Sequence, residues 1–352
     1  MRIILDGMGG DNAPGEIVKG AAIVSKLVDH EICIIGDEEQ IKKELSKFDH
    51  EPKNIIIVHA SEVITAEDKP VRAIRGKKDS SLVKGLMMVK YGEGDMLLSA
   101  GNSGAIMTGA LLLLGRIGNV DRPALGSVYP FLEKGKIGLV IDAGANTDCR
   151  PGSMLYFAAM GALYAEKVLG ISNPTIGLVN VGTEPNKGSM VLKETYQLLE
   201  KTKNQKGLNF IGNIEGRDVP LGVADVMVCD GLSGNLILKV TEGVALSILG
   251  LMKQHFTSSF SAKIGALLLK PKLKAMKSSF NYEEYGGAPI LGVNAPVIKI
   301  HGSSTHEAVV SGVLKAVPYV EKNVIGDMGK AIAEMDEILA LAHEIDLDGE
   351  SD

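Results

Sequence analysis

Polar residues and glycines recur directly after short apolar runs, at six places along the chain. Each junction places a polar residue beside Gly, Asn, Ser or Thr and then leads into a helix or a turn. The six segments are LDGMGGDNAPG, SAGNSG, DAGANTD, NVGTEPNKG, DGLSGN and HGSS. Glycine-rich turns before a helix leave backbone N–H groups free, and such groups bind anions. The junctions therefore predict an anion site, with plain tight turns as the alternative for any one of them.

The standard nucleotide-binding patterns are incomplete. Gly7 and Gly9 match the first two glycines of G-x-G-x-x-G, but Asn12 stands at the third position. The chain also lacks the G-x-x-x-x-G-K-[ST] loop of nucleotide hydrolases. A small anion such as orthophosphate fits these loops better than a dinucleotide. A nicotinamide-dependent dehydrogenase on a related fold remains the alternative enzyme class.

One lysine and several neutral donors stand at the expected helix starts. Lys187 lies beside Gly188, where its charge would add to that of free N–H groups, and a solvated lysine is the alternative. The neutral donors are Asn102, Ser103, Ser233 and Asn235. These residues can hold an oxyanion, and each also fits a plain N-cap. Together they predict a phosphate site.

No strong protein nucleophile or metal pattern is present in the sequence. Cys149, beside Arg150, is the best covalent candidate, although a buried or incidental cysteine is the favoured interpretation. The histidines do not have metal-ligand spacing. His301 follows an apolar run and can serve as an acid or base, or only orient its loop. Phosphate itself is then the expected nucleophile, with positioning supplying much of the rate.

Continuous apolar runs alternate with helical patterns, which predicts a largely parallel sheet in a three-layer α/β/α fold. The expected strands are residues 3–5, 32–35, 55–58, 96–98, 137–141, 176–179, 226–228 and 297–300. Helices are expected to begin near residues 15, 38, 80, 104, 153, 188, 235 and 305. Ligands bind at the carboxyl ends of parallel strands, so the six loops are expected along one edge of the sheet. Residues 1–330 are expected to form one catalytic domain, followed by a helix and acidic tail over 331–352.

Residues 243–283 break this pattern, because they are rich in lysine and apolar residues and contain Glu283 as their single acidic residue. They predict a protruding helical hairpin that docks on an anionic partner or membrane surface. The alternative is a solvated hairpin with residues 267–269 buried at a dimer interface. The proposed docking residues are Lys263, Leu267, Leu268, Leu269, Lys270, Lys272 and Lys274.

Composition excludes several other classes. The net charge is −6, tryptophan is absent and aromatic residues make up 4% of the chain, which does not suit nucleic-acid binding. Three widely spaced cysteines predict a reducing, cytoplasmic compartment. Asp6 interrupts the first apolar run, so no signal peptide is expected. The most apolar stretch, residues 105–114, is too short to span a membrane.

Taken in order, the loop motifs resemble the bacterial PlsX family of phosphate acyltransferases. The matching motifs are LDGMGGDNAP, LLSAGNSGA, DRPAL, IDAGANTDCRP, VNVGTEPNKG, GNIEGRDVPLG, DVMVCDGLSGN and YEEYGGAPILGV…IHGSS. They run from Met1 to about Val320. The resemblance implies that a long-chain acyl thioester of acyl carrier protein reacts with orthophosphate to give acyl phosphate.

The resemblance also implies an architecture, partners and a location. It implies an isocitrate/isopropylmalate dehydrogenase-like homodimer that needs no organic cofactor and associates peripherally with the inner face of the cell membrane. The product would feed the acyltransferase that acylates glycerol 3-phosphate. A non-enzymatic membrane scaffold for lipid synthesis is the remaining alternative.

The resemblance and the loops together assign roles to individual residues. Lys187 is expected to hold phosphate, Asn235 to bind the oxyanion or phosphate, and His301 to protonate the departing thiolate or orient its loop. The other expected substrate- and phosphate-binding residues are Asp6, Gly9, Gly10, Asp11, Asn102, Ser103, Gly104, Asn146, Gly188, Ser233, Gly234 and Gly302.

Overall fold

The computed structural model describes residues 1–48, 54–205, 208–256, 259, 265, 267, 269 and 286–349. The strands are β1 (Arg2–Asp6), β2 (Glu31–Gly36), β3 (Ile55–His59), β4 (Met96–Ser99), β5 (Ala124–Pro130), β6 (Ile137–Ile141), β7 (Thr175–Asn180), β8 (Asn209–Glu215), β9 (Val226–Val228), β10 (Ala288–Leu291) and β11 (Val297–Lys299). The helices up to residue 169 are α1 (Gly15–Val24), α2 (Glu38–Leu45), α3 (Pro70–Gly76), α4 (Ser81–Lys90), α5 (Ser103–Gly109), η1 (Ala110–Leu114), α6 (Pro151–Tyr164) and η2 (Ala165–Leu169). The later helices are α7 (Met190–Gln205), η3 (Val219–Leu221), α8 (Gly231–Phe256), α10 (His306–Glu321) and α11 (Val324–Gly349).

The described strands form one 11-stranded sheet in the order β3-β2-β1-β4-β11-β10-β5-β6-β9-β7-β8. Pairing is antiparallel where β10 meets β11, where β10 meets β5 and where β5 meets β6. The other pairings are parallel. The sheet is therefore mixed and mostly parallel, as expected.

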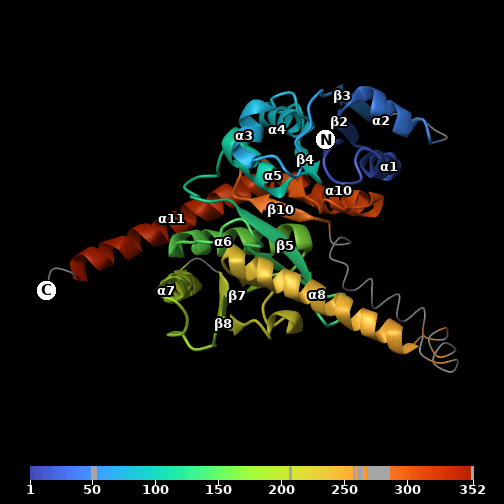
Figure 1. The fold of residues 1–352 in the computed structure, drawn as a ribbon. Coiled ribbons are helices and arrows are strands. Elements are labelled where there is room, and N and C mark those ends of the chain that lie inside the picture. The colour runs from blue at the N-terminus through green and yellow to red at the C-terminus, as the bar shows by residue number, and fades with distance from the viewer. Residues whose placement is uncertain are drawn as a thin grey trace.

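Helices cover both faces of the sheet, which gives the expected three layers (Figure 1). One face packs against α1, α6, α7, α10 and α11. The other face packs against α3, α4 and α5 in the first half of the sheet and against the start of α8 in the second. Alternate residues of β1 show the two faces, because Ile3 and Leu5 join the first core and Ile4 joins the second.

The expectation that all six loops lie along one edge is wrong. Three successive antiparallel pairings reverse the strand direction between β11 and β6. The carboxyl ends of β1, β4 and β11 therefore face one edge, and those of β6, β9 and β7 face the other. β5 and β10 cause this reversal, and neither was expected from the sequence. β5 contains Gly126, Ser127 and Pro130, and β10 has four residues and contains Pro289, so neither shows the continuous apolar run of a buried parallel strand.

α8 is longer than expected, and it extends beyond the sheet on which its start packs (Figure 1). It begins at Gly231, so the hairpin expected over residues 243–283 starts inside this helix. By length and composition alone α8 could cross a membrane, and its apolar window is not buried within the described chain. Residues 105–114 lie in a shorter apolar helix, but the expectation that no stretch of the chain reaches membrane-spanning length is corrected by α8. Isolated polar residues such as Lys239 and Glu242 interrupt α8 and hide its apolar character in the sequence.

The expected carboxyl-terminal helix is present, but it starts before residue 331. α11 begins at Val324 and buries Met328, Ile332, Met335 and Ile338 in the main core. The tyrosine hydroxyl of α6 residue Tyr156 also donates to Asp336 Oδ1, at 2.5 Å. The first half of α11 is therefore part of the α/β/α unit.

Candidate functional site

A cavity of about 150 Å³, partly open to solvent, lies between α8 and the sheet face formed by β5, β10 and β11. Two of the predicted site residues line it, Asn235 at the start of α8 and His301 after β11. The other lining residues are Leu125, Ser127, Val128, Tyr129, Pro130, Ala143, Leu238, Lys239, Thr241, Glu242, Ala245, Gly287, Ala288, Lys299, Ile300, Ser304 and Ala308. The cavity thus brings together loops from opposite edges of the sheet, because it lies over the face between them.

Lys299 lines this cavity with a partly buried side chain. Burial, and then the nearby charge of Lys239, lower the pKa of Lys299 below its ordinary value. The ammonium of Lys239 is paired with Glu242, with 3.1 Å between Nζ and Oε2. Lys299 has no carboxylate partner among the described residues. A partly buried cation that no described carboxylate pairs with favours an anionic ligand in this cavity.

His301 and Ser304 add hydrogen-bonding groups beside Lys299. The Ser303 backbone N–H donates to His301 Nδ1 at 3.3 Å, and the Ser303 hydroxyl lies 2.8 Å from the same nitrogen. Nδ1 therefore accepts, which assigns the proton of a neutral ring to Nε2. Ser304 Oγ is buried and has no hydrogen-bond partner among the described residues. Both side chains line the cavity, so an anion there would meet a hydroxyl and an imidazole as well as a cation.

Asp6 lies beneath the loops and does not line the cavity. Its side chain is buried, and Ser99 Oγ donates to Asp6 Oδ2 at 2.6 Å. Burial raises the pKa of Asp6. A Cβ atom on Gly9 would lie 2.5 Å from Asp6 Oδ2, and the Gly101 N–H donates to Ser99 Oγ. Asp6 therefore positions the first two loops against each other.

Gly10, Asp11 and Gly302 join the first loop to the loop after β11. Gly10 has a φ of +100°, and a Cβ there would lie 2.9 Å from the Gly302 carbonyl oxygen. The Asp11 N–H donates to that same oxygen at 2.8 Å. Asp11 itself is exposed. These contacts hold the loop that carries His301. Gly10, Asp11 and Gly302 therefore affect the cavity indirectly, by positioning a loop that lines it.

The predicted donors at the start of α5 are used within the chain. Asn102 caps α5, because its Oδ1 accepts from the Ala105 N–H at 3.1 Å. Its amide nitrogen lies within 3.1–3.3 Å of the carbonyl oxygens of Thr65, Ala66 and Asp68. Ser103 is exposed and Gly104 packs against Pro70. The N-cap interpretation of Asn102 is thus confirmed, and none of the three residues lines the cavity.

Asn146 is held within its own loop by Asp142. The Asp142 carboxylate accepts from the N–H groups of Leu125, Gly144, Ala145 and Asn146, and from the Asn146 side chain. Burial raises the pKa of Asp142, although these hydrogen bonds oppose the shift. The Asn146 amide also donates to the Pro123 carbonyl oxygen at 2.8 Å. Both amide hydrogens of Asn146 are therefore occupied, and its role in this structure is to shape the loop.

The start of α8 approaches the end of β6 closely. A Cβ on Gly234 would lie 1.9 Å from the Asp142 carbonyl oxygen. The N–H groups of Gly231, Ser233 and Gly234 already donate to Asn146 and Asp230. Asn235, one residue on, is exposed and lines the cavity. Gly234 thus lets α8 come close enough to place Asn235 there.

Lys187 lies in a different part of the molecule. Its loop follows β7, and β6 and β9 separate that strand from β5, a span of about 14 Å at the usual strand spacing. The Lys187 side chain is 49% exposed and lies 4.0 Å from Glu184. Gly188 has a φ of +86° and sits against Asn180. Neither residue lines the cavity.

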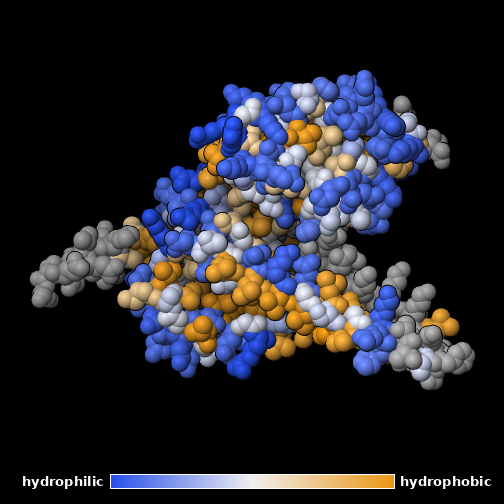
Figure 2. Space-filling model, viewed as in Figure 1, coloured by the Kyte–Doolittle hydropathy of each residue, from blue (hydrophilic) through white to orange (hydrophobic). Residues whose placement is uncertain are grey.

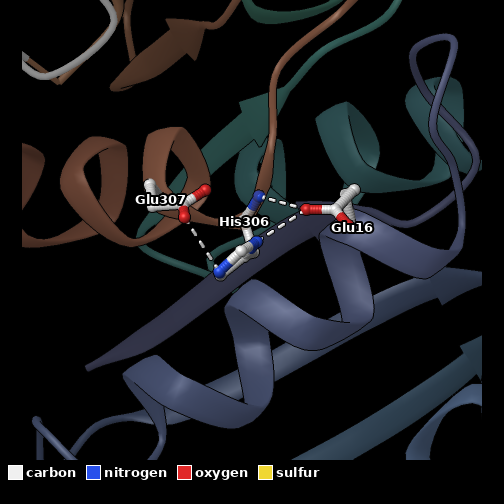
Figure 3. A group of neighbouring side chains, drawn as sticks. All are labelled: Glu16, His306 and Glu307. Atoms are coloured by element: carbon white, nitrogen blue, oxygen red, sulfur yellow. Dashed lines mark hydrogen bonds and ion pairs between the residues drawn. The ribbon is translucent and has the colours of Figure 1, made fainter.

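A histidine and two carboxylates form a second polar cluster, between α1 and α10 (Figure 3). Glu16 Oε2 lies 2.7 Å from His306 Nδ1 and accepts from the His306 N–H at 2.6 Å. His306 Nε2 lies 3.2 Å from Glu307. Both ring nitrogens of His306 thus face carboxylate oxygens. The cluster clamps α1 to α10 behind the loops.

The cysteines are poor nucleophiles. Cys33, Cys149 and Cys229 are buried and reduced. Burial first, and then Asp142 and Asp230, raise the pKa of Cys149 to about 12. A thiol with that pKa is protonated at neutral pH, which confirms the interpretation of Cys149 as a buried cysteine.

The expected docking hairpin falls mostly outside the described residues. Lys263, Leu268, Lys270, Lys272 and Lys274 are not described. Leu267 and Leu269 are described and are 70% and 44% exposed.

Two cavity residues escaped the sequence analysis. Lys299 was part of an expected strand and Ser304 part of the HGSS motif, but neither was singled out. The signal for Lys299 was a lysine inside an otherwise apolar run, VIKI, beside the loop of His301. Buried charges in strands are rare unless they serve a site.

Comparison with known proteins places the chain in a family. A family model described as "Fatty acid synthesis protein" matches residues 1–327. A phosphate acyltransferase of Alkaliphilus oremlandii is 48% identical over 335 residues, which cover 95% of this chain and 98% of that protein. A phosphate acyltransferase of Geobacillus thermodenitrificans is 49% identical over 327 residues, which cover 93% and 97%.

Solved structures share the fold at low sequence identity. A phosphotransacetylase from Streptococcus pyogenes aligns with a TM-score of 0.62 and 16% identity, over 92% of this chain and 94% of that chain. A branched-chain phosphotransacylase from Enterococcus faecalis aligns with a TM-score of 0.56 and 16% identity, over 91% and 99%.

The fold and the relatives together define an acyltransferase enzyme built on a mostly parallel α/β sheet. The chain belongs to the PlsX family of phosphate acyltransferases, which serves fatty acid and phospholipid synthesis.

Proposed function

We propose that this enzyme transfers a long-chain acyl group from the thioester of acyl carrier protein to orthophosphate, which yields acyl phosphate and free carrier protein. One observation carries the placement of the reaction. Asn235 and His301, predicted from separate motifs, line one cavity with the uncompensated Lys299. A cation, an amide, an imidazole and a hydroxyl there suit a phosphate and a developing oxyanion.

The proposed mechanism needs no covalent enzyme intermediate. A phosphate oxygen attacks the thioester carbon, and the carbonyl electrons move to oxygen in a tetrahedral intermediate. That oxyanion collapses, the C–S bond breaks and the thiolate leaves. Lys299 and Asn235 stabilise the negative charge, and His301 Nε2–H donates a hydrogen bond to the departing sulfur. The proton that hydrogenphosphate loses as the acyl phosphate forms ends on that sulfur, which gives the free thiol. The high pKa of Cys149 supports direct attack by phosphate.

Lys187 remains the competing candidate for the phosphate cation. The motif around it supports that role, whereas its exposure and its position beside β7 support Lys299. The loops around Asp6, Asn102 and Gly302 are proposed to frame the substrate pocket by holding the His301 loop.

We further propose a homodimer of isocitrate/isopropylmalate dehydrogenase-like architecture on the cytoplasmic face of the membrane. The exposed apolar surface of α8 and the exposed Leu267 support a partner surface outside this chain. The enzyme would deliver its product to the acyltransferase that acylates glycerol 3-phosphate.

Light scattering, which measures the molar mass in solution, tests whether the protein is a dimer. Flotation of the wild type and of Leu267→Glu on anionic vesicles tests the membrane association, and unchanged flotation of the variant would reject anchoring at Leu267.

The decisive experiment mixes the protein with hexadecanoyl-acyl carrier protein, with and without orthophosphate, and traps the product with hydroxylamine. We expect phosphate-dependent release of carrier thiol and a trappable acyl phosphate. A folded sample that releases no thiol would overturn the proposed reaction. Carrier-protein and vesicle binding without turnover would favour a scaffold, and tight NADH binding would favour a dehydrogenase.

A further inference from the structure

A group of four cations, the α3 patch, lies on and beside helix α3. It consists of Lys69, Arg72, Arg75 and Lys78, and all four residues are exposed. None of these four side chains has an ion pair or a hydrogen bond within the part of the chain that the structure describes. Figure 2 shows hydrophilic side chains over this helix, at the upper left of the molecule. The α3 patch is therefore open to a partner.

The two faces of α3 differ in character. Ala73 and Ile74 are buried in the core beneath the helix. Val71, Arg72 and Arg75 lie on the opposite face, because residues three or four positions apart share one side of a helix. Val71 is 50% exposed, so this face combines cations with an apolar side chain. That combination is typical of protein interfaces, where charge guides the encounter and apolar contacts add affinity.

The acidic residues around α3 do not cancel the patch. Asp68 Oδ2 lies 2.6 Å from Lys77 Nζ, and Asp79 Oδ1 lies 2.7 Å from Lys84 Nζ. Residues 61–84 contain six lysines and arginines against four acidic residues, whereas the whole chain has a net charge of −6. A local positive field on an acidic protein favours a partner with an acidic surface.

The α3 patch lies on the same face of the sheet as the cavity of the candidate site. α3 packs against α5, and the Asn102 amide that precedes α5 donates to carbonyl oxygens in residues 65–68. α5 follows β4, which pairs with β11, the strand before the His301 loop. Val297 of β11 joins the core beneath α3 and α5, and Lys299 shares its side of the strand. In Figure 1, β5 and β10 lie between α5 and α8, so the patch stands across the cavity from α8.

We propose that the α3 patch docks the acidic carrier protein that delivers the acyl thioester. The proposal rests on the proposed function, because it places the protein part of that substrate. A carrier protein presents its thioester at the end of a flexible arm, so its body must dock beside the cavity. An acidic protein fits better than an anionic membrane, because Val71 is the one large apolar side chain that α3 exposes and membrane binding needs a wider apolar face.

The first test reverses the charge of the patch. Arg72→Glu/Arg75→Glu is compared with Lys26→Glu/Lys201→Glu, which makes the same change of charge at exposed sites beside α1 and on α7, over the other face of the sheet. At low salt we expect the first variant to raise the KM for hexadecanoyl-acyl carrier protein about ten-fold. Its KM for hexadecanoyl pantetheine, which has no protein part, should stay nearly unchanged. The rise should shrink at about 0.5 M salt, and the control should leave both KM values unchanged.

Several outcomes of this test contradict the proposal. An unchanged KM for the carrier-protein thioester in the α3 variant would show that the carrier protein docks elsewhere. An equal rise for hexadecanoyl pantetheine would mean that α3 acts on the cavity itself. Lost flotation on anionic vesicles with an unchanged KM would assign the patch to a membrane. A wild type that turns over neither thioester would instead refute the proposed function.

The second test detects docking without turnover. The three cysteines of the chain are buried, so Val71→Cys introduces an exposed thiol that accepts a benzophenone photo-cross-linker. We expect acyl carrier protein to cross-link to this position and not to Leu27→Cys, whose native side chain is 58% exposed beside α1. Adding Arg72→Glu/Arg75→Glu should suppress the cross-link. Equal yields at the two positions would overturn the proposal, whether or not the enzyme is active.

Discussion

At the scale of single residues, the electrostatics of the cavity depend on one lysine. Lys239 has Glu242 as its counter-ion, and Lys299 has no carboxylate partner among the described residues. Phosphate would supply the missing charge, so the energetic effect of Lys299 should appear mainly in phosphate binding.

Lys299→Met should therefore raise the KM for phosphate. A lost hydrogen bond to a charged group is worth about 2 kcal/mol, or roughly 30-fold. Steady-state kinetics at fixed acyl thioester measure this change, with the exposed Lys134→Met as the control. If Lys187→Met raises the KM and Lys299→Met does not, the phosphate lies beside β7 instead.

The lowered pKa of Lys299 also predicts a pH dependence. A lysine whose pKa is lowered loses its charge at a lower pH than an ordinary lysine. The KM for phosphate should thus rise as pH increases through that pKa. Lys299→Arg stays charged and should remove this rise. Phosphate itself changes charge with pH in the assays of both proteins, so its titration affects both equally. An identical rise of the KM for phosphate in the wild type and in Lys299→Arg would therefore contradict the assignment of Lys299 as the phosphate-binding cation.

At the scale of elements, close packing of α8 on the end of β6 positions Asn235. Gly234→Ala would place its Cβ 1.9 Å from the Asp142 carbonyl oxygen, so the helix must shift. We expect it to lower the free energy of unfolding by about 1–3 kcal/mol and to impair catalysis. Gly243→Ala, with nothing near its Cβ, should instead stabilise α8 by up to about 1 kcal/mol. Thermal unfolding measures the stability of both variants. Equal changes in the free energy of unfolding for Gly234→Ala and Gly243→Ala would contradict the close packing of α8 on β6.

The clamp between α1 and α10 predicts how stability depends on pH. Hydrogen bonds from the His306 side chain and N–H lower the pKa of Glu16 from its ordinary 4.5. The clamp therefore stabilises the fold fully above that ordinary value and loses its effect as pH falls through the lowered pKa. Glu16→Gln should destabilise the protein by about 1 kcal/mol at neutral pH, and the difference should shrink in acid. Urea unfolding at several pH values measures it, and a constant difference would argue against the clamp.

At the scale of the whole molecule, the carboxyl-terminal helix belongs to the core. Ile332 is fully buried, whereas Leu341 on the same helix is 50% exposed. Ile332→Ala should destabilise the protein by about 3 kcal/mol, and Leu341→Ala should have little effect on stability. Denaturant unfolding compares them. Similar small effects would mean that α11 packs independently of the sheet.

The sequence by itself determined the local elements and the residues that cap them. Continuous apolar runs predicted three of the buried strands, at Ile3–Leu5, Ile137–Ile141 and Val226–Val228. The prediction works because each of these strands is covered on both faces and so needs apolar side chains on both. The starts of α1 and α2 were also placed correctly. His301 and Asn235 were found because polar residues after buried strands stand out locally.

Only the tertiary structure decided which of these residues meet. Strand direction depends on pairing between distant segments, and the antiparallel strands β5 and β10 reverse it between the two halves of the sheet. That reversal moves the cavity from one edge to the face over β5 and β10, beneath α8. It brings Asn235 and His301 together and leaves Lys187 beside β7. Lys299 was hidden in the sequence because its importance comes from burial without a partner, a property of the space around it and not of its neighbours in the chain.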